Sequence, residues 1–159
     1  MEQKSLSKWL KFITLGIAVC GIAVFAFLIP IVGKDLVEKY PEYSHCYYPW
    51  LIFLYAAGIP CYAVLILVWQ IASNIGKDRS FTITNAKKLK TISLLAAGDA
   101  AFFFIVNIVY LLANMSHPSI ALASLLVVFA GVVISVIAAA LSHLIKKAAD
   151  LQEQSDLTI

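Results

Sequence analysis

Long uncharged stretches, separated by short charged segments, make up most of this chain. Residues 12–33 form the first stretch, and residues 50–75 form most of the second. A bilayer core of about 30 Å is crossed by roughly 20 helical residues, so each stretch is long enough for one transmembrane helix. The first stretch is longer than the apolar region of a signal peptide, and we therefore expect a retained helix.

The third uncharged stretch is too long for a single crossing of the membrane. Between Lys90 and Lys146 the only formal charge is that of Asp99. A polar segment at residues 115–119, which includes Pro118, divides the stretch and predicts an antiparallel helical hairpin. The chain is therefore predicted to be all-α, one transmembrane domain (1–159) built as a membrane four-helix bundle. Its helices are expected at about 12–33, 50–75, 91–114 and 120–145.

Composition agrees with a protein for which lipid is part of the solvent. The hydrophobic fraction is 62% and the charged fraction 13%, whereas soluble domains have about 45–50% and about 25%. The formal net charge is +3. The cations gather at the predicted membrane edges, so the lipid bilayer is the expected partner and direct nucleic-acid binding is not.

The distribution of Lys and Arg predicts the orientation. Only Lys34 and Lys39, of the 12 cationic residues, fall between the first and second helices. The others lie in the N-terminal arm, between the second and third helices, or after the fourth helix. The positive-inside rule therefore places both termini in the cytoplasm.

Local sequence features refine the bundle. Pro60 is expected to kink the second helix because it removes one helical hydrogen bond. The acidic, polar tail at residues 148–159 is expected to be disordered. Small residues on the third and fourth helices are expected to meet, because close backbone approach stabilises helix pairs in lipid. The small residues are Ala96, Ala97, Gly98, Ala100 and Ala101 on the third helix and Gly131, Ser135 and Ala139 on the fourth.

Asp99 is the most informative residue for chemistry. A carboxylate near mid-membrane costs about 2.5–3.5 kcal/mol on insertion scales, so it should face protein or water. Asn107 and Tyr110 are expected to share its polar stripe. Three interpretations remain open: a cation or proton site in a transport path, a protonation switch, and the favoured one, a carboxylate that fixes helix register. Its expected partners are Gln70, Ser135, Ser142 and His143.

The inner segment at residues 77–90 combines cations with apolar side chains. The favoured interpretation is that it orients the chain and anchors it to anionic headgroups, and the alternative is that it docks a cytoplasmic partner. Thr84 or Asn85 is expected to cap the helix that follows. The residues expected to contact lipid or a partner are Lys77, Arg79, Phe81, Lys87, Lys88 and Lys90.

Catalytic and metal-binding patterns do not emerge from the sequence. The three histidines and three cysteines lack metal-ligand spacing, and no nucleophile stands near a base in a recognisable motif. We therefore expect no enzyme activity, no metal and no cofactor. The redox state of Cys46, the thiol in a polar loop, stays open.

The segment Gly76-Lys-Asp-Arg-Ser-Phe-Thr-Ile-Thr-Asn-Ala-Lys-Lys-Leu-Lys-Thr-Ile92 resembles the signature of a bacterial family of small four-helix membrane proteins of unknown function. In that family a glycine and a Pro-Phe or Ser-Phe pair precede a Thr-x-x-Asn turn and a basic segment. Ser80 stands where the family often has proline. The resemblance implies a location in the bacterial cytoplasmic (inner) membrane. It also implies a role beside a small helix-turn-helix regulator, because members are often encoded next to one.

Two functions follow from these observations. The preferred one is a non-enzymatic membrane protein that senses or regulates together with the cytoplasmic helix-turn-helix regulator. The alternative is a small transporter or channel component that uses Asp99. Four helices are few for a transport path in a monomer, so this alternative predicts a homo-oligomer.

Overall fold

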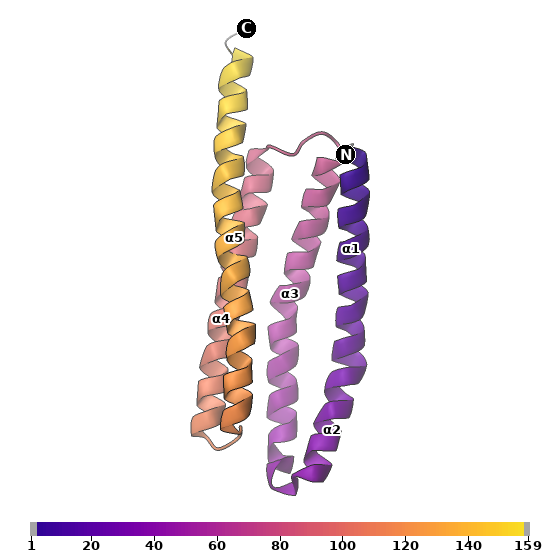
Figure 1. The fold of residues 1–159 in the computed structure, drawn as a ribbon, viewed down its shortest axis with the longest axis vertical. Coiled ribbons are helices and arrows are strands. Elements are labelled where there is room, and N and C mark those ends of the chain that lie inside the picture. The colour runs from indigo at the N-terminus through magenta and orange to yellow at the C-terminus, as the bar shows by residue number, and fades with distance from the viewer. Residues whose placement is uncertain (1–2, 158–159) are drawn as a thin grey trace.

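The computed structural model describes residues 3–157, which form helices joined by short turns (Figure 1). In chain order these are α1 (Gln3–Ala23), the π-helical turn η1 (Val24–Leu28), α2 (Ile29–Lys39), the 3-10 helix η2 (Pro41–Cys46), α3 (Tyr47–Ile75), α4 (Ile83–Leu112) and α5 (Pro118–Leu157). Within the described residues, four helical units are long and apolar enough to cross a membrane: Gln3–Lys39, Pro41–Ile75, Ile83–Leu112 and Pro118–Ser155. The prediction of four membrane-crossing helices in an all-α fold is confirmed.

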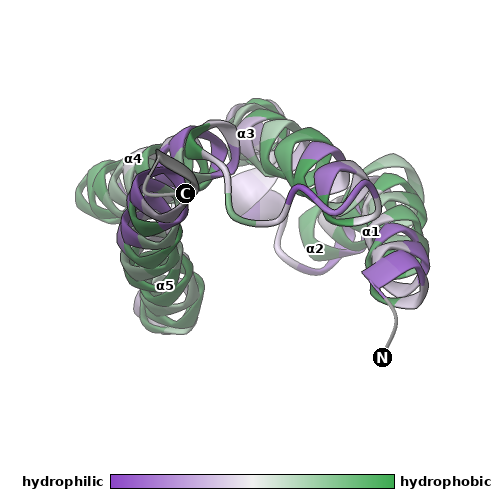
Figure 2. Ribbon diagram, turned by 90° about the horizontal axis from the view of Figure 1, so that it is seen from above, coloured by the Kyte–Doolittle hydropathy of each residue, from purple (hydrophilic) through white to green (hydrophobic). Residues whose placement is uncertain are grey.

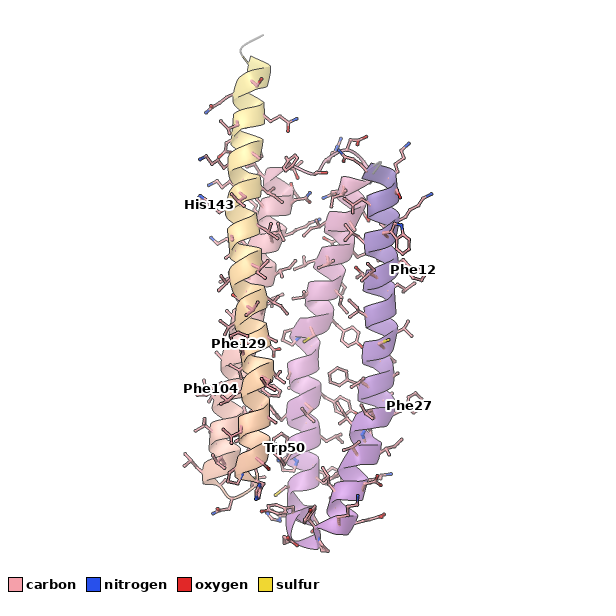
Figure 3. The ribbon with its side chains drawn as sticks, in the orientation of Figure 1. Phe12, Phe27, Trp50, Phe104, Phe129 and His143 are labelled. Carbon is pink, nitrogen blue, oxygen red and sulfur yellow. The ribbon has the colours of Figure 1, made fainter. Side chains whose placement is uncertain are left out.

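The helices run between two ends that differ in polarity. Both chain ends and the connection at residues 76–82 lie at one end, here called the terminal end (Figure 1). The 3-10 helix η2 and the connection at residues 113–117 lie at the other, here called the turn end. Figure 2 looks onto the terminal end, where the hydrophilic residues gather. Along the shafts, large apolar side chains such as Phe12 (70% exposed) and Phe27 (66%) point away from the protein (Figure 3).

A π-helical turn lets the first membrane-crossing helix continue past Pro30. In this turn the Ile29 N–H bonds to the Val24 carbonyl, one residue further back than in an α-helix. The next donor in that register would be Pro30, which has no N–H. The Phe25 carbonyl is thereby left free, and it accepts a hydrogen bond of 2.9 Å from the Tyr55 hydroxyl of α3. The turn is thus tied to the neighbouring helix.

Two helices end with the same backbone conformation. Asp78, after α3, has φ 56°, and Asn114, after α4, has φ 55°. Both are residue types that tolerate the left-handed conformation. Behind them the Arg79 N–H bonds to the Asn74 carbonyl at 3.0 Å, and the Met115 N–H bonds to the Tyr110 carbonyl at 2.8 Å. These hydrogen bonds, each to the carbonyl five residues back, are typical of a Schellman motif, which satisfies the last helical carbonyls.

The helices stand in an open, curved row. α1 and α2 pack on α3, α3 packs on α4, and α4 packs on α5 over the most extensive contact. Figure 2 shows that this row bends around a concave side, into which α2 leans. Among the described residues, α1 and α5 at the two ends of the row do not form a packed pair of this kind.

Small residues allow the close approach of α4 and α5, as expected, but only part of the predicted set is used. Ala96 and Ala100 are buried, and a Cβ built on Gly131 would lie 3.0 Å from the Ala100 Cβ. On α5 the buried small residues are Ser124 and Ala138, and the predicted Ala139 is exposed because it lies one residue further around the helix. The predicted residues of α4 that face away from this contact are Ala97, Gly98 and Ala101.

Several predicted boundaries differ from the structure. The third helix starts at Ile83 and not at about 91, so the second half of the expected inner loop 77–90 is helical. The expected disorder of the tail 148–159 is wrong for residues 148–157, which continue α5, and residues 158–159 lie outside the described range. Pro60 lies inside α3, whose ribbon changes direction near its middle (Figure 1). That Pro60 causes this bend stays a prediction.

We predict that Gly131→Val destabilises the protein and that Gly98→Val does not. The new side chain at position 131 meets Ala100 and the Ala96 carbonyl, whereas nothing lies within 4 Å of a Cβ at Gly98. Overpacking of this kind costs about 1–3 kcal/mol. The measurement is the free energy of unfolding in mixed detergent micelles as denaturing detergent is added. Equal losses in the two variants would show that α4 and α5 do not pack through Gly131.

Candidate functional site

Asp99 lies near the middle of α4 and faces a cysteine of α3. The Cys61 thiol donates to Asp99 Oδ2 at 3.8 Å. Asp99 Oδ1 is buried and has no hydrogen-bond partner among the described residues. A thiol is a weak donor, so the carboxyl group is held with little compensation for the loss of water. An unpaired oxygen at such a position is typical of a group that binds a proton or a cation, or of a group that is kept neutral.

The partners expected for Asp99 are engaged elsewhere or lie at the surface. Ser135 donates to the Ser93 carbonyl at 2.9 Å, with the two hydroxyl oxygens 3.2 Å apart. Ser142 donates to the Ala86 carbonyl at 2.7 Å. Gln70 and His143 are exposed. The partner that the structure assigns, Cys61, was overlooked because a cysteine in an apolar run reads as a small apolar residue.

Asn107 and Tyr110 do not join Asp99 in one hydrogen-bonded stripe. Asn107 is 2% exposed, donates to the Phe103 carbonyl at 2.8 Å, and leaves its own Oδ1 without a partner among residues 3–157. The Tyr110 hydroxyl donates to the Pro49 carbonyl at 3.0 Å. Its ring packs on Trp50 at 5.2 Å between centroids. Asn107 and Tyr110 therefore stabilise contacts within and between helices, and Asp99 stands apart from them.

The terminal end is closed by a network centred on Asn85. This side chain is fully buried, at 0% exposure. Its Oδ1 accepts from the Asn74 amide at 2.7 Å, and its Nδ2 donates to the carbonyls of Arg79 at 2.9 Å and Ser80 at 3.0 Å. The Asn85 N–H also donates to the Thr82 hydroxyl at 3.3 Å. The N-terminal cap of α4 is therefore Thr82, and the expectation of Thr84 or Asn85 is wrong, because the helix begins earlier in the Thr-x-x-Asn turn than expected.

The first turns of α1 complete this network, here called the terminal-end clasp (residues 3–7, 72–82 and 85). Ser7 donates to the Ala72 carbonyl at 2.6 Å. A Cβ at Gly76 would lie 2.7 Å from the Ser7 hydroxyl oxygen, so the chain approaches closely there. The side chains of Ser80 and Gln3 are also hydrogen-bonded. The clasp thus holds α1, α3 and α4 in one arrangement.

The clasp presents the predicted contact residues on its outer surface. Lys77, Arg79 and Phe81 are exposed on the connection, and Phe81 is 57% exposed. Lys87 and Lys90 are exposed on the first turns of α4, where Lys88 is half-buried. A hollow of about 560 Å³ lies between this connection and α5, whose Ala149, Gln152 and Glu153 line it. Cations, an exposed aromatic ring and a hollow therefore meet at one end of the protein.

Clusters that could hold a metal are not found among the described residues, where no three His, Cys, Asp or Glu side chains come together. Cys46 is a free thiol in the structure, 3.2 Å from His45 Nε2. It lies at the turn end, far along the chain from both Asp99 and the clasp.

Comparison with known proteins agrees with the architecture. The chain is a multi-pass membrane protein, and residues 31–159 match the model of a family described as "Protein of unknown function (DUF2975)". It belongs to this family. It is 31% identical over 153 residues to the "Uncharacterized membrane protein YoaS" of Bacillus subtilis (strain 168), a similarity that covers 93% of this chain and 96% of that protein. No solved structure matches it significantly.

We predict that Asn85→Ala disrupts the terminal-end clasp and destabilises the protein. The change removes three side-chain hydrogen bonds and leaves the Asn74 amide and two backbone carbonyls without their partner. With about 1 kcal/mol for each bond, the loss in unfolding free energy is about 3 kcal/mol. Hydrogen exchange of the backbone amides at residues 76–82 should also become faster. Thr84→Ala, at an exposed neighbouring position, is the control. Unchanged exchange in Asn85→Ala would contradict the clasp.

Proposed function

We propose that this protein is a non-enzymatic membrane module whose terminal end lies in the cytoplasm and docks a soluble regulator there. The observation that carries the proposal is the shape and chemistry of that end. α5 continues to Leu157 and projects beyond the start of α4 (Figure 1). Together with the clasp it borders the hollow described above.

The exposed side chains favour a protein partner as well as lipid. Arg and aromatic residues dominate the binding energy of protein interfaces. Arg79 and Phe81 are exposed in the connection, while the backbone carbonyls of Arg79 and Ser80 accept hydrogen bonds from Asn85. The docking residues are therefore held rigidly, which lowers the entropy that binding costs. The helix-turn-helix regulator implied by the resemblance is the proposed partner.

We predict that Arg79→Glu together with Phe81→Ala strongly reduces capture of the proposed helix-turn-helix regulator. Loss of a binding hot spot weakens association by about tenfold or more. The clasp should persist, since Asn85 bonds to backbone carbonyls and not to these side chains. The measurement is co-purification of the regulator in mild detergent and from cells.

The matched control is Lys39→Glu, which changes an exposed cation at the opposite end. It should leave capture unchanged. If wild-type protein captures no regulator under either condition, or if both variants capture it equally, the proposal fails.

A second candidate function rests on Asp99. Its buried, unpartnered Oδ1 supports a proton or cation site in a small transporter or channel component. The open row of helices leaves Asp99 half-buried, so a second copy would be needed to enclose a path. This candidate therefore includes a homo-oligomer.

We predict under this second function that Asp99→Asn reduces proton or cation flux into liposomes by about tenfold or more, because an isosteric amide cannot carry the charge. Cys61→Ala, which removes only the weak thiol donor, should lower flux less. Proton flux is measured with a pH-sensitive dye inside the liposomes, and the oligomeric state is measured in the same preparation. Wild-type protein that is monomeric and shows no flux would exclude the candidate.

A further inference from the structure

A second hollow lies at the turn end, on the opposite side of the protein from the clasp. Its volume is about 770 Å³, within the range of small-molecule sites. Its walls come from α2, η2, α3 and the first turn of α5, so it occupies the concave side of the helix row. Trp50, labelled in Figure 3, points from α3 toward the α4–α5 pair, and its indole N–H donates to the Met115 carbonyl at 3.0 Å. This bond fixes the wall that α3 and the α4–α5 turn share.

The hollow changes from apolar to polar along its length. Toward the middle of the helices its walls are aliphatic, as at Leu28, Val32 and Leu54. At the turn end they carry hydroxyl and imidazole groups, as at Tyr43, Ser116 and His117. Of the residues that the structure describes, no Asp, Glu, Lys or Arg lines it. A molecule that fits this gradient has an apolar body and one polar end.

The hollow crosses the boundary between the hydrocarbon and the headgroups. Its lining runs along the first membrane-crossing helix from Leu28 to Tyr40. At 1.5 Å per residue this is about 18 Å, of which the uncharged part from Leu28 to Gly33 makes up about 8 Å. Because Lys34 and Asp35 end the uncharged stretch, the lining from Leu28 to Gly33 lies in the hydrocarbon and the lining from Val37 to Tyr40 lies at the headgroups, which is how a lipid molecule is oriented.

The shape of the walls favours a flexible chain over a helix from a second copy. Helices approach each other in lipid through small residues. The walls here are branched and bulky, as at Val32, Leu54 and Ile120. The one glycine among them, Gly33, is already covered, because a Cβ built there would lie 2.8 Å from the Tyr47 ring. An acyl chain can follow such an irregular surface where a helix cannot.

The polar end offers hydrogen-bond donors. His117 Nδ1 accepts the Ser119 backbone N–H at 3.3 Å and lies 2.7 Å from the Ser119 hydroxyl oxygen. In the neutral ring the remaining proton therefore sits on Nε2, which can donate outward. Tyrosine hydroxyls of the same lining are further donors. Oxygen acceptors of a phosphodiester or ester headgroup match this end.

We propose that the hollow at the turn end binds one membrane phospholipid, with an acyl chain along α2 and α3 and its headgroup beside His117. The site is distinct from the terminal end and does not depend on the function proposed for that end. Its occupant fills the part of the concave side that α2 and the other described elements leave open.

The test is photolabelling in phosphatidylethanolamine vesicles that contain a phosphatidylglycerol with a diazirine in its acyl chain. Adducts located by peptide mass spectrometry should concentrate on residues 28–36 and 115–120 and should saturate as the probe fraction rises. Phe129 and Leu122, exposed on other faces, report ordinary surrounding lipid.

Ile120→Trp fills the hollow and should lower the saturable labelling by about tenfold, since displacing even two methylenes has that effect on binding. Leu122→Trp, on the other face of α5, should not lower it. Val32→Trp with Ile31→Trp as its control repeats the comparison on α2, in case one tryptophan disturbs folding.

Three results would overturn the proposal. The first is labelling that does not saturate and is equal at Phe129 and Leu122, which indicates only surrounding lipid. The second is saturable labelling that persists in both hollow-filling variants. The third is cross-linking of two copies of the chain to each other through residues 32 and 120 in the same vesicles, which indicates that a second copy fills the hollow.

Discussion

The need to satisfy every backbone polar group without water governs this structure. An unpaired N–H or C=O in hydrocarbon costs several kcal/mol, so the chain crosses the membrane only as helices. Where Pro30 removes a donor, the helix changes to a π-turn and the Tyr55 hydroxyl takes the free Phe25 carbonyl. Where helices end, Asp78 and Asn114 adopt a left-handed conformation that closes the last carbonyls.

The same constraint shapes how the helices meet. Hydroxyl groups reach across to carbonyls of neighbouring helices, as Ser7 does to Ala72 and Ser142 does to Ala86. Each carbonyl has a second lone pair, so these bonds add to the helical ones. Together with close approach at small residues they fix the register of each pair. They link each helix to its neighbour in the row and leave the concave side open.

α5, like α3, reaches from the turn-end hollow to the terminal end of the protein. Its first turn forms part of the wall of the turn-end hollow, and its last turns border the hollow beside the clasp. It is a single helix from Pro118 to Leu157. Asp99 lies between these regions on α4, the helix against which α5 packs most closely.

Much of the fold could be predicted because its signals are local. The uncharged runs are as long as a bilayer is thick, and the turn at Pro118 interrupts the longest run, so the number and order of helices follow from the sequence. The continuation of α5 through residues 148–157 was not predicted, because its acidic and polar composition resembles that of a tail. The earlier start of α4 was also missed, since Thr82 caps a helix whose first turns are charged.

The sites depended on the tertiary structure. Asp99 stands out in the sequence as a charge within an apolar run, but its contact with Cys61 arises only when α3 and α4 pack. Asn85 reads locally as a turn residue, and its role appears only when Asn74 and the carbonyls of the connection surround it. The sequence by itself determined that the chain lies in a membrane, that it crosses it four times and that one carboxylate falls within an apolar run, because hydrophobicity and charge act residue by residue. Which polar groups are paired, and where hollows remain, was decided by packing between helices, because those properties belong to contacts between residues far apart in the chain.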